Sequence, residues 1–268
     1  MRDPTMAVIP AEALAVAVRR LRAAGCVFAE EEADLLAAAA ADADELSAMV
    51  GRRAGGLPVE QVAGYADFCG VRVLLRPGVF VPRPRTASLV RLAVAGIDPA
   101  ATVVDLCCGS GALGAAVAAQ VPGVRLHAAD LDPVAVACAR ANLARLDGRV
   151  HRGDLFAALP RRLRGGVDLL LANVPYVPSG EIRLLPPEAR LHEPLTALDG
   201  GPDGLDLLRR VAAGAPAWLA AGGRVLLETT SAQAAAACAA LDAAGLAAHA
   251  VADDEWDATV IVGSAPPR

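Results

Sequence analysis

The chain has 268 residues, 55% of them hydrophobic and 21% charged, which supports a compact fold of one or two domains and argues against long disordered segments. Its 25 basic residues are all arginine, so enzymes that need a lysine to form a Schiff base, anchor pyridoxal phosphate or bind phosphate in a P-loop are excluded. A net charge of −5 and an aromatic content of 3% provide neither a general basic field nor many stacking surfaces for nucleic acid.

Residues 1–64 are predicted to form a helical domain. The first ten residues carry charges and lack an apolar run, so we expect no signal peptide. Helical periodicity predicts one helix over Ala11–Ala24 and a second over Glu30–Val50. The glycines and the proline of segment 51–58 are expected to end the second helix.

Residues 65–90 are predicted to form a hairpin and a linker. Two short strands, Val71–Arg76 and Val79–Val81, flank a Pro-Gly pair that is typical of a turn. The prolines on either side of Arg83 then stiffen the chain before a helix over Thr86–Ala95.

Residues 91–268 alternate between apolar strands and helices, which predicts an α/β domain with a mostly parallel sheet covered by helices on both faces. Asp132, followed by a proline, and Ser231 are the expected N-caps of two of these helices. The predicted strands are Thr102–Leu106, Val124–Ala129, Arg149–His151, Val167–Ala172, Arg224–Glu228, Ala247–Val251 and Ala258–Val262, and the predicted helices are Gly111–Gln120, Pro133–Leu146, Gly204–Leu219 and Ala232–Ala244.

A glycine-rich turn follows the first of these strands. Residues 109–114 match the pattern G-x-G-x-x-G, so a dinucleotide-binding unit for NAD has to be considered, although a tight strand-to-helix turn would need the same glycines. Asp105 precedes the glycines and can accept hydrogen bonds from the loop or from a ligand ammonium. The stretch Leu106–Val124 has 19 residues without a charge, but its glycines favour a turn that opens a buried helix over a membrane span.

Two further acids follow the next two predicted strands. Asp130 can accept hydrogen bonds from both hydroxyls of a ribose, or it can cap the helix that follows. Asp154 can meet an adenine amino group, or it can be an ordinary turn acid.

The strand Val167–Ala172 runs into the sequence Asn173-Val174-Pro175-Tyr176. The asparagine side chain and the neighbouring carbonyls can accept both N–H groups of a planar NH₂, and the tyrosine can pack against its face. This arrangement suits an amide or exocyclic amine whose lone pair must be aimed at an electrophilic methyl group. The alternative is a capped turn after a buried strand.

With these motifs, the chain resembles the class I S-adenosylmethionine methyltransferases, specifically the glutamine methyltransferases that act on release factors and ribosomal proteins. The glycine-rich loop is common to the whole fold, and the Asn-x-Pro-Tyr turn is shared with enzymes that methylate bases. The resemblance also covers Gly56–Gly64, Phe68–Val71 and Pro77–Pro84. The segments more specific to the glutamine methyltransferases are Val81–Pro84 and Glu193–Leu205.

The resemblance implies the cofactor S-adenosylmethionine and a cytoplasmic enzyme whose partner is a protein that carries a glutamine, without membrane or stable nucleic-acid binding. The acceptor amide would bind the Asn173 side chain and the Val174 carbonyl, beside Pro175 and against Tyr176. The implied cofactor residues are Asp105, Cys107, Gly109, Gly111, Asp130, Asp154 and Asn173, and the substrate-binding residues are Arg83, Asn173, Tyr176 and Glu193.

The chain departs from this family at several positions. Val174 replaces the first proline of the usual Asn-Pro-Pro-Tyr, Cys107 replaces a glycine and is expected to keep a negative φ, and Arg85 and Ala87 replace acids. The shorter helical part suggests a paralogue with the same chemistry and another protein substrate. A nucleic-acid amine methyltransferase, an NAD oxidoreductase and a non-catalytic S-adenosylmethionine-binding protein remain alternatives.

The six cysteines form no CxxC pair and the four histidines are scattered, so we expect reduced thiols and no metal site.

Overall fold

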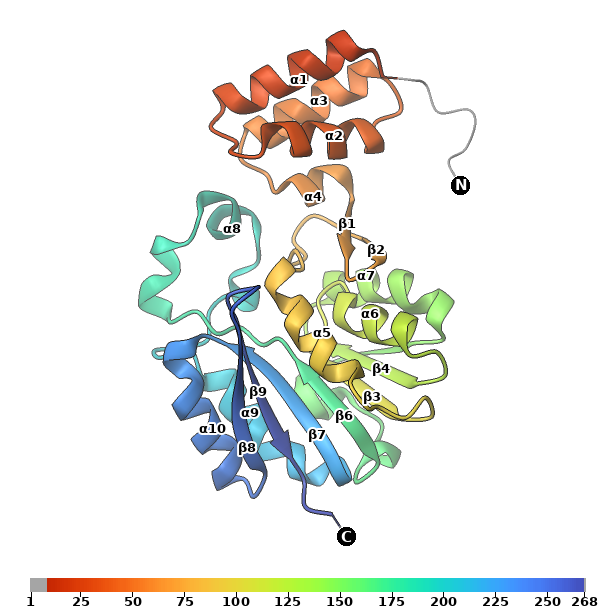
Figure 1. Cartoon of the computed structure of the whole chain (residues 1–268), viewed down its shortest axis with the longest axis vertical. Helices are drawn as coiled ribbons and strands as arrows, with labels where there is room; N and C mark the ends of the chain where they lie inside the picture. The colour runs from red at the N-terminus through yellow and green to blue at the C-terminus, as the bar shows by residue number, and fades with distance from the viewer. Residues whose placement is uncertain (1–8, 268) are drawn as a thin grey trace.

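The computed structural model describes residues 9–267, and the segment 1–8, on which the prediction of no signal peptide largely rests, lies outside the described residues. Figure 1 shows a small group of helices at the N-terminal end, set above a larger part in which helices surround a twisted sheet. The predicted α/β fold with an N-terminal helical part is therefore confirmed.

The N-terminal part consists of α1 (Ala11–Ala23), α2 (Ala29–Ala39), α3 (Ala43–Ala54) and α4 (Val59–Ala63). The prediction of one helix over residues 30–50 is wrong, because the chain is extended at Ala40 and a new helix starts after it. Asp42 caps α3 by accepting the backbone N–H of Glu45 at 2.8 Å. The predicted helix end within segment 51–58 is confirmed, because α3 ends at Ala54 and Gly55 follows as its C-cap.

The hairpin contains one of the two predicted strands, because the predicted Val71–Arg76 is observed over Val71–Leu74. β1 (Tyr65–Phe68) pairs antiparallel with β2 (Val71–Leu74) around a two-residue loop, Cys69 and Gly70, whose φ angles are +48° and +82°. Positive φ at both loop residues matches the twist of a tight hairpin. The predicted strand Val79–Val81 is wrong, since this segment is not paired in a sheet.

The large sheet has seven strands in the order β5-β4-β3-β6-β7-β9-β8. The first five of these are parallel, whereas β9 lies antiparallel to both β7 and β8. The strands are β3 (Thr102–Leu106), β4 (Arg125–Asp130), β5 (Arg149–Arg152), β6 (Val167–Ala172), β7 (Leu219–Thr229), β8 (Ala247–Asp253) and β9 (Ala258–Ser264).

Helices cover both faces of this sheet, and an apolar cluster lies between the sheet and each helical layer. One layer contains α5 (Ala87–Val94), α6 (Ala112–Gln120) and α7 (Pro133–Leu143), and the other contains α9 (Asp206–Gly214) and α10 (Ala234–Ala243). No helix in residues 9–267 is long and apolar enough to cross a membrane.

The two predicted caps have different outcomes. Asp132 caps α7 as predicted, because its Oδ1 accepts the backbone N–H of Val134 at 2.8 Å. The prediction for Ser231 is wrong, since Thr230 and Gln233 form a capping box before α10. Thr230 is one residue earlier and has the extended backbone that an N-cap requires.

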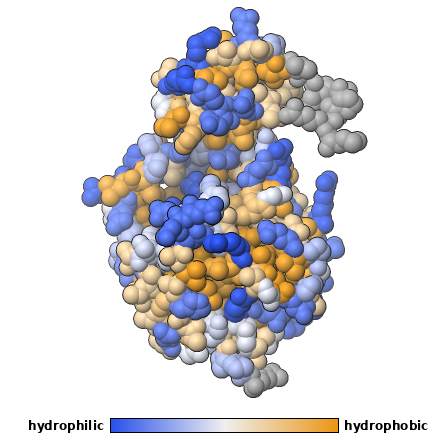
Figure 2. Space-filling model, in the orientation of Figure 1, coloured by the Kyte–Doolittle hydropathy of each residue, from blue (hydrophilic) through white to orange (hydrophobic). Residues whose placement is uncertain are grey.

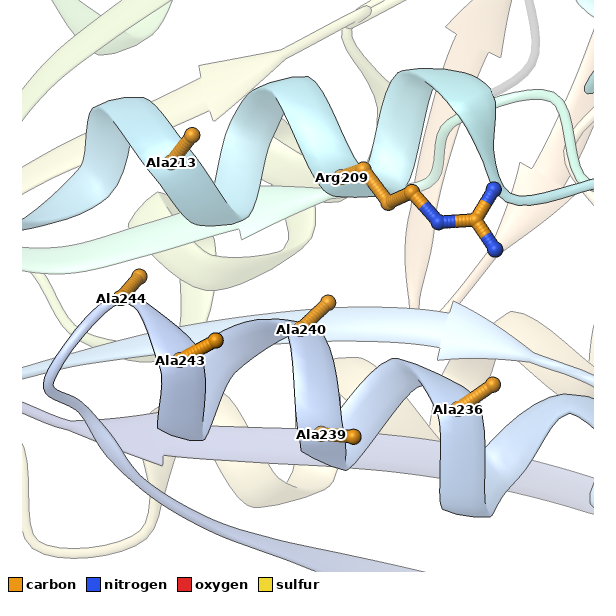
Figure 3. Close-up of a pocket in the computed structure, with 7 residues that line it drawn as sticks. All are labelled: Arg209, Ala213, Ala236, Ala239, Ala240, Ala243 and Ala244. Atoms are coloured by element: carbon orange, nitrogen blue, oxygen red, sulfur yellow. The ribbon is translucent and has the colours of Figure 1, made fainter.

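An insert between β6 and α9 contains α8 (Pro187–His192) and several 3₁₀ turns that the sequence did not predict. It exposes three leucines, Leu184, Leu191 and Leu195, and hydrophobic surface is visible there in Figure 2. Arg53 of α3 ties the helical part to this insert, because its guanidinium lies 2.8 Å from Glu188 of α8. A groove between α9 and α10 is lined by Arg209 and six alanines and carries no other polar side chain (Figure 3).

Candidate active site

The candidate site lies where four neighbouring strands, β4, β3, β6 and β7, reach their carboxyl ends. In parallel sheets this edge is the usual place for ligands. The register pairs Leu106 with Ala172, so the loop after β3 and the turn after β6 leave the sheet side by side. The same register continues to β7, where Ala172 pairs with Leu227.

Asp105 is fully buried near the end of β3. Its Oδ2 accepts the backbone N–H of Gly114 at 3.0 Å, whereas Oδ1 has no partner in the described part of the chain. Burial, with a smaller contribution from the nearby charge of Asp130, raises the pKa of this carboxyl to about 7, while the hydrogen bond from Gly114 acts in the opposite direction. A buried acceptor without a partner costs about 1–3 kcal/mol, so this oxygen suits a donor from a bound group.

The loop after β3 turns through left-handed backbone at three positions. Gly109 and Gly111 have φ angles of +54° and +78°. The expectation that Cys107 keeps a negative φ is wrong, because its φ is +55°. A side chain in this conformation costs roughly 1–2 kcal/mol, so the loop geometry is held at Cys107 against local strain.

Two glycines let the loop and α6 pack closely. A Cβ at Gly111 would lie 3.2 Å from the Cβ of Ala139, and one at Gly114 would lie 3.2 Å from Oδ2 of Asp105. These contacts satisfy the alternative interpretation of the motif as a tight strand-to-helix turn. At Gly109, by contrast, a Cβ would meet no atom within 4 Å, so this glycine leaves open space beside the loop.

Asp130 closes this loop from the end of β4. Its Oδ2 accepts the N–H of Gly109 and its Oδ1 accepts the N–H of Asp132, both at 2.9 Å. Asp130 does not cap α7, because Asp132 does. Burial raises the pKa of Asp130, and a carboxylate with two hydrogen bonds retains lone pairs for two further donors.

Asp154 follows β5 and lies half-exposed. Its Oδ2 pairs with Arg210 of α9 at 2.6 Å, a partner that the sequence did not suggest. The contact with an adenine group therefore stays a prediction, and it would have to coexist with this ion pair.

Asn173 begins the turn after β6. Its Nδ2 donates to Oγ1 of Thr86 at 3.3 Å, and no hydrogen bond within residues 9–267 involves its Oδ1. The amide is thereby oriented with its oxygen available as an acceptor. Val174 and Pro175 are buried, so the next two residues fix the backbone of the turn and leave little of their side chains exposed.

The Gly-Gly-Pro-Asp-Gly segment, residues 200–204, packs against this turn. A Cβ at Gly200 would lie 2.7 Å from the Pro175 carbonyl oxygen, and a Cβ at Gly204 would lie even closer to the Tyr176 carbonyl oxygen. Gln233 also donates to the Tyr176 carbonyl at 2.9 Å. The glycines of this segment are therefore required by close backbone contact with the turn.

Tyr176 points its hydroxyl into a polar cluster. The hydroxyl donates to Oε1 of Glu228 at 2.9 Å and accepts from Nη2 of Arg85 at 2.7 Å. Burial and the Glu228 charge raise the pKa of Tyr176, while Arg85 acts in the opposite direction. Sequence reasoning missed Glu228, although an acid at the end of an apolar strand beside the turn was a usable signal.

Arg83 and Glu193, both predicted to bind substrate, form an ion pair with each other. Nη2 of Arg83 lies 2.5 Å from Oε2 of Glu193, and Oε1 of Glu193 accepts the N–H of Val81 at 3.2 Å. Burial raises the pKa of Glu193 and Arg83 opposes that shift. The pair pins the Pro-Arg-Pro segment to the insert, and the substrate-binding roles of both residues stay predictions.

Comparisons with known proteins find similarity to methyltransferases. Residues 70–185 match the family model "Methyltransferase small domain". A release factor glutamine methyltransferase from Cereibacter sphaeroides is 40% identical over 266 residues, covering 91% of this chain and 94% of the relative. A 4-amino-L-phenylalanine/4-methylamino-L-phenylalanine methyltransferase from Streptomyces pristinaespiralis is 39% identical over 208 residues, covering 75% of this chain and 70% of that protein.

A solved methyltransferase structure from Pyrococcus furiosus has a TM-score of 0.56 and 15% identity, covering 74% of this chain and 90% of the other. At that identity the likeness concerns the fold alone.

Proposed function

The chain belongs to the release factor glutamine methyltransferase family, and we propose that it transfers a methyl group from S-adenosylmethionine to the side-chain amide nitrogen of a glutamine in a peptide release factor. The 40% identity extends over nearly the whole length of both proteins, so the similarity to this family includes the helical part as well as the sheet. The identity of the protein substrate and the role of each site residue are our proposals.

The orientation of Asn173 carries the proposal. Its Nδ2 is engaged by Thr86, which leaves Oδ1 to accept one N–H of the substrate amide. We assign the second N–H to the Val174 carbonyl and the packing of the amide plane to Tyr176. Two acceptors on one NH₂ group fix the direction of the nitrogen lone pair. For so weak a nucleophile, this orientation is the main way in which positioning lowers the activation barrier.

The residues around the glycine-rich loop fit the cofactor. We assign Asp130 to the ribose hydroxyls, the unpartnered Oδ1 of Asp105 to the ammonium side of the ligand, and Gly109 and Gly111 to close backbone approach. We also keep Cys107, Asp154 and Asn173 as cofactor contacts. When bound, S-adenosylmethionine supplies a methyl group activated by a positive sulfur.

No side chain has to remove a proton before the methyl transfer in this scheme. The amide nitrogen keeps both hydrogens while Asn173 and Val174 hold it, and it becomes acidic only once it is positively charged. Acceptors placed around the nitrogen also stabilise the positive charge that develops there. Pro175 contributes by fixing the backbone of the turn.

We assign residues 1–64 to recognition of the protein substrate, 65–90 to the linker, and 91–268 to catalysis. The ion pair between Arg53 and Glu188 supports a fixed relation between the first part and the insert beside the acceptor turn. Six free cysteines support a reducing compartment, and we propose the cytoplasm. The net charge of −5 gives no support to stable nucleic-acid binding.

The test is methyl transfer from labelled S-adenosylmethionine to purified release factors, with separate incubations containing a ribosomal protein fraction, RNA and 4-amino-L-phenylalanine. We expect label in a release factor and in no other arm. Label only in RNA or in the arylamine would contradict the proposal and favour the corresponding alternative. Binding of the cofactor without label in any arm would contradict the proposed function and favour either a non-catalytic protein or a paralogue with another protein substrate.

A further inference from the structure

Arg85 stands at the edge of the acceptor turn. It lies in the 3₁₀ turn Pro84–Thr86 that precedes α5, and its Nη2 donates to Oη of Tyr176 at 2.7 Å. Its Nε lies 3.4 Å from Oε1 of Glu228. The next residue, Thr86, is the hydrogen-bond partner of Asn173. Arg85 is therefore one residue away from the group that orients the proposed amide acceptor.

The Arg85 guanidinium has donors that the protein does not use. A guanidinium carries five N–H donors in a fixed plane. One nitrogen serves Tyr176 and another faces Glu228, while no protein partner for Nη1 occurs within residues 9–267. The side chain is 48% exposed, so the remaining donors are accessible at the edge of the site.

Glu228 is the acidic partner of the Arg85 guanidinium. Its carboxylate is buried and its Oε2 has no partner in the described residues. In that part of the chain Arg85 is the one cation paired with it. Because a buried carboxylate needs a counter-charge, Glu228 stabilises the Arg85 guanidinium in its position beside the Tyr176 ring.

We propose that Arg85 is a specificity-determining residue that binds a carbonyl or carboxylate oxygen of the substrate segment flanking the acceptor glutamine. This inference rests on the proposed function. A planar, preorganised guanidinium donates to such oxygens in pairs with little loss of side-chain freedom. The Glu228–Tyr176 pair positions it, so binding of the substrate chain and orientation of the acceptor amide use one connected hydrogen-bond network.

The test is steady-state kinetics of Arg85→Ala, Arg85→Lys and wild type with a purified release factor, together with cofactor affinity by calorimetry. Arg85→Ala should raise KM for the release factor about tenfold, while kcat stays within about threefold and the Kd for S-adenosylmethionine is unchanged. Arg85→Lys should recover only part of the loss, because lysine lacks the planar pair of donors. Arg91→Ala is the matched control, since Arg91 also pairs with an acid and is 63% exposed but does not contact the acceptor turn.

Arg85→Ala leaves Glu228 buried without its cation, so the double variant Arg85→Leu/Glu228→Gln provides a neutral network that can fold. It should show the same rise in KM as Arg85→Ala. A KM equal to that of wild type in both variants would overturn the role of Arg85, and so would an equal loss in cofactor affinity. A wild-type enzyme that labels no release factor would instead contradict the proposed function itself.

Discussion

The cofactor cradle and the acceptor cluster share one edge of the sheet but are built in different ways. The cradle consists of the segment 105–114 and one acid from the adjacent strand, joined by backbone N–H groups that donate to carboxylates. The acceptor cluster consists of side chains far apart in sequence: Asn173 and Tyr176 of the acceptor turn with their partners Thr86, Arg85 and Glu228. The cradle is thus a local backbone structure, whereas the cluster depends on how the strands and α5 are placed.

This difference predicts that the two halves can be damaged separately. Changes in the cradle should alter cofactor affinity, while changes in the acceptor cluster should alter transfer and substrate binding with cofactor affinity preserved.

The largest effect is expected at Asn173. Asn173→Ala removes the acceptor oxygen that orients the amide, so kcat should fall by about 10²–10³, comparable with the loss of one preorganised transition-state hydrogen bond. Cofactor affinity should stay within a few-fold of wild type, as measured by calorimetry. A parallel loss of cofactor affinity would mean that the two halves are not separable at this residue.

The next effect is expected at Asp130. Asp130→Ala removes the proposed ribose acceptor and the anchor of the Gly109 N–H, so the Kd for S-adenosylmethionine should rise about 10- to 100-fold. At saturating cofactor, kcat should stay within about tenfold of wild type. An unchanged Kd would place the ribose elsewhere, and circular dichroism would verify that the variant is folded.

A pH dependence of cofactor binding should follow from Asp105. Burial raises its pKa to about 7, and an ammonium group binds only the ionised carboxylate. The affinity should therefore weaken as pH falls below about 7, approaching tenfold per pH unit. Asp105→Asn should bind more weakly above pH 7 and lose this slope, because the amide can still accept from Gly114 but does not titrate. A slope that persists in the variant would assign the titration to another group.

The smallest effect is expected at Cys107. Cys107→Gly relieves the positive φ, which should raise the free energy of unfolding by up to about 1 kcal/mol, reduced by the greater freedom of glycine in the unfolded chain. Differential scanning calorimetry would measure this change. A marked loss of stability would show that the thiol packing outweighs the backbone strain.

The contrast between local backbone structure and distant side-chain partners also explains which features the sequence predicted correctly. β3 and β6 have the predicted bounds, and Asp105, Gly109 and Asp130 meet in one loop, because strand hydrophobicity and glycine requirements are local signals. The break between α2 and α3 was missed because alanine favours helix on both sides of it.

Side-chain partners were harder to predict than backbone turns. Thr86 and Glu228 meet Asn173 and Tyr176 only through the register of β6 with β7 and the position of α5, neither of which a single sequence displays. The hairpin was misplaced because the Pro-Gly pair is a strong turn signal, while the Cys69-Gly70 loop depends on a cysteine with positive φ.

The central claim is that the acceptor turn presents a glutamine amide to the methyl group. The most direct measurement is tandem mass spectrometry of a release factor after reaction with this enzyme and S-adenosylmethionine. The account predicts one added methyl group on the side-chain nitrogen of a single glutamine, absent with Asn173→Ala. A methyl group on any other residue type, or an unmodified release factor, would contradict it.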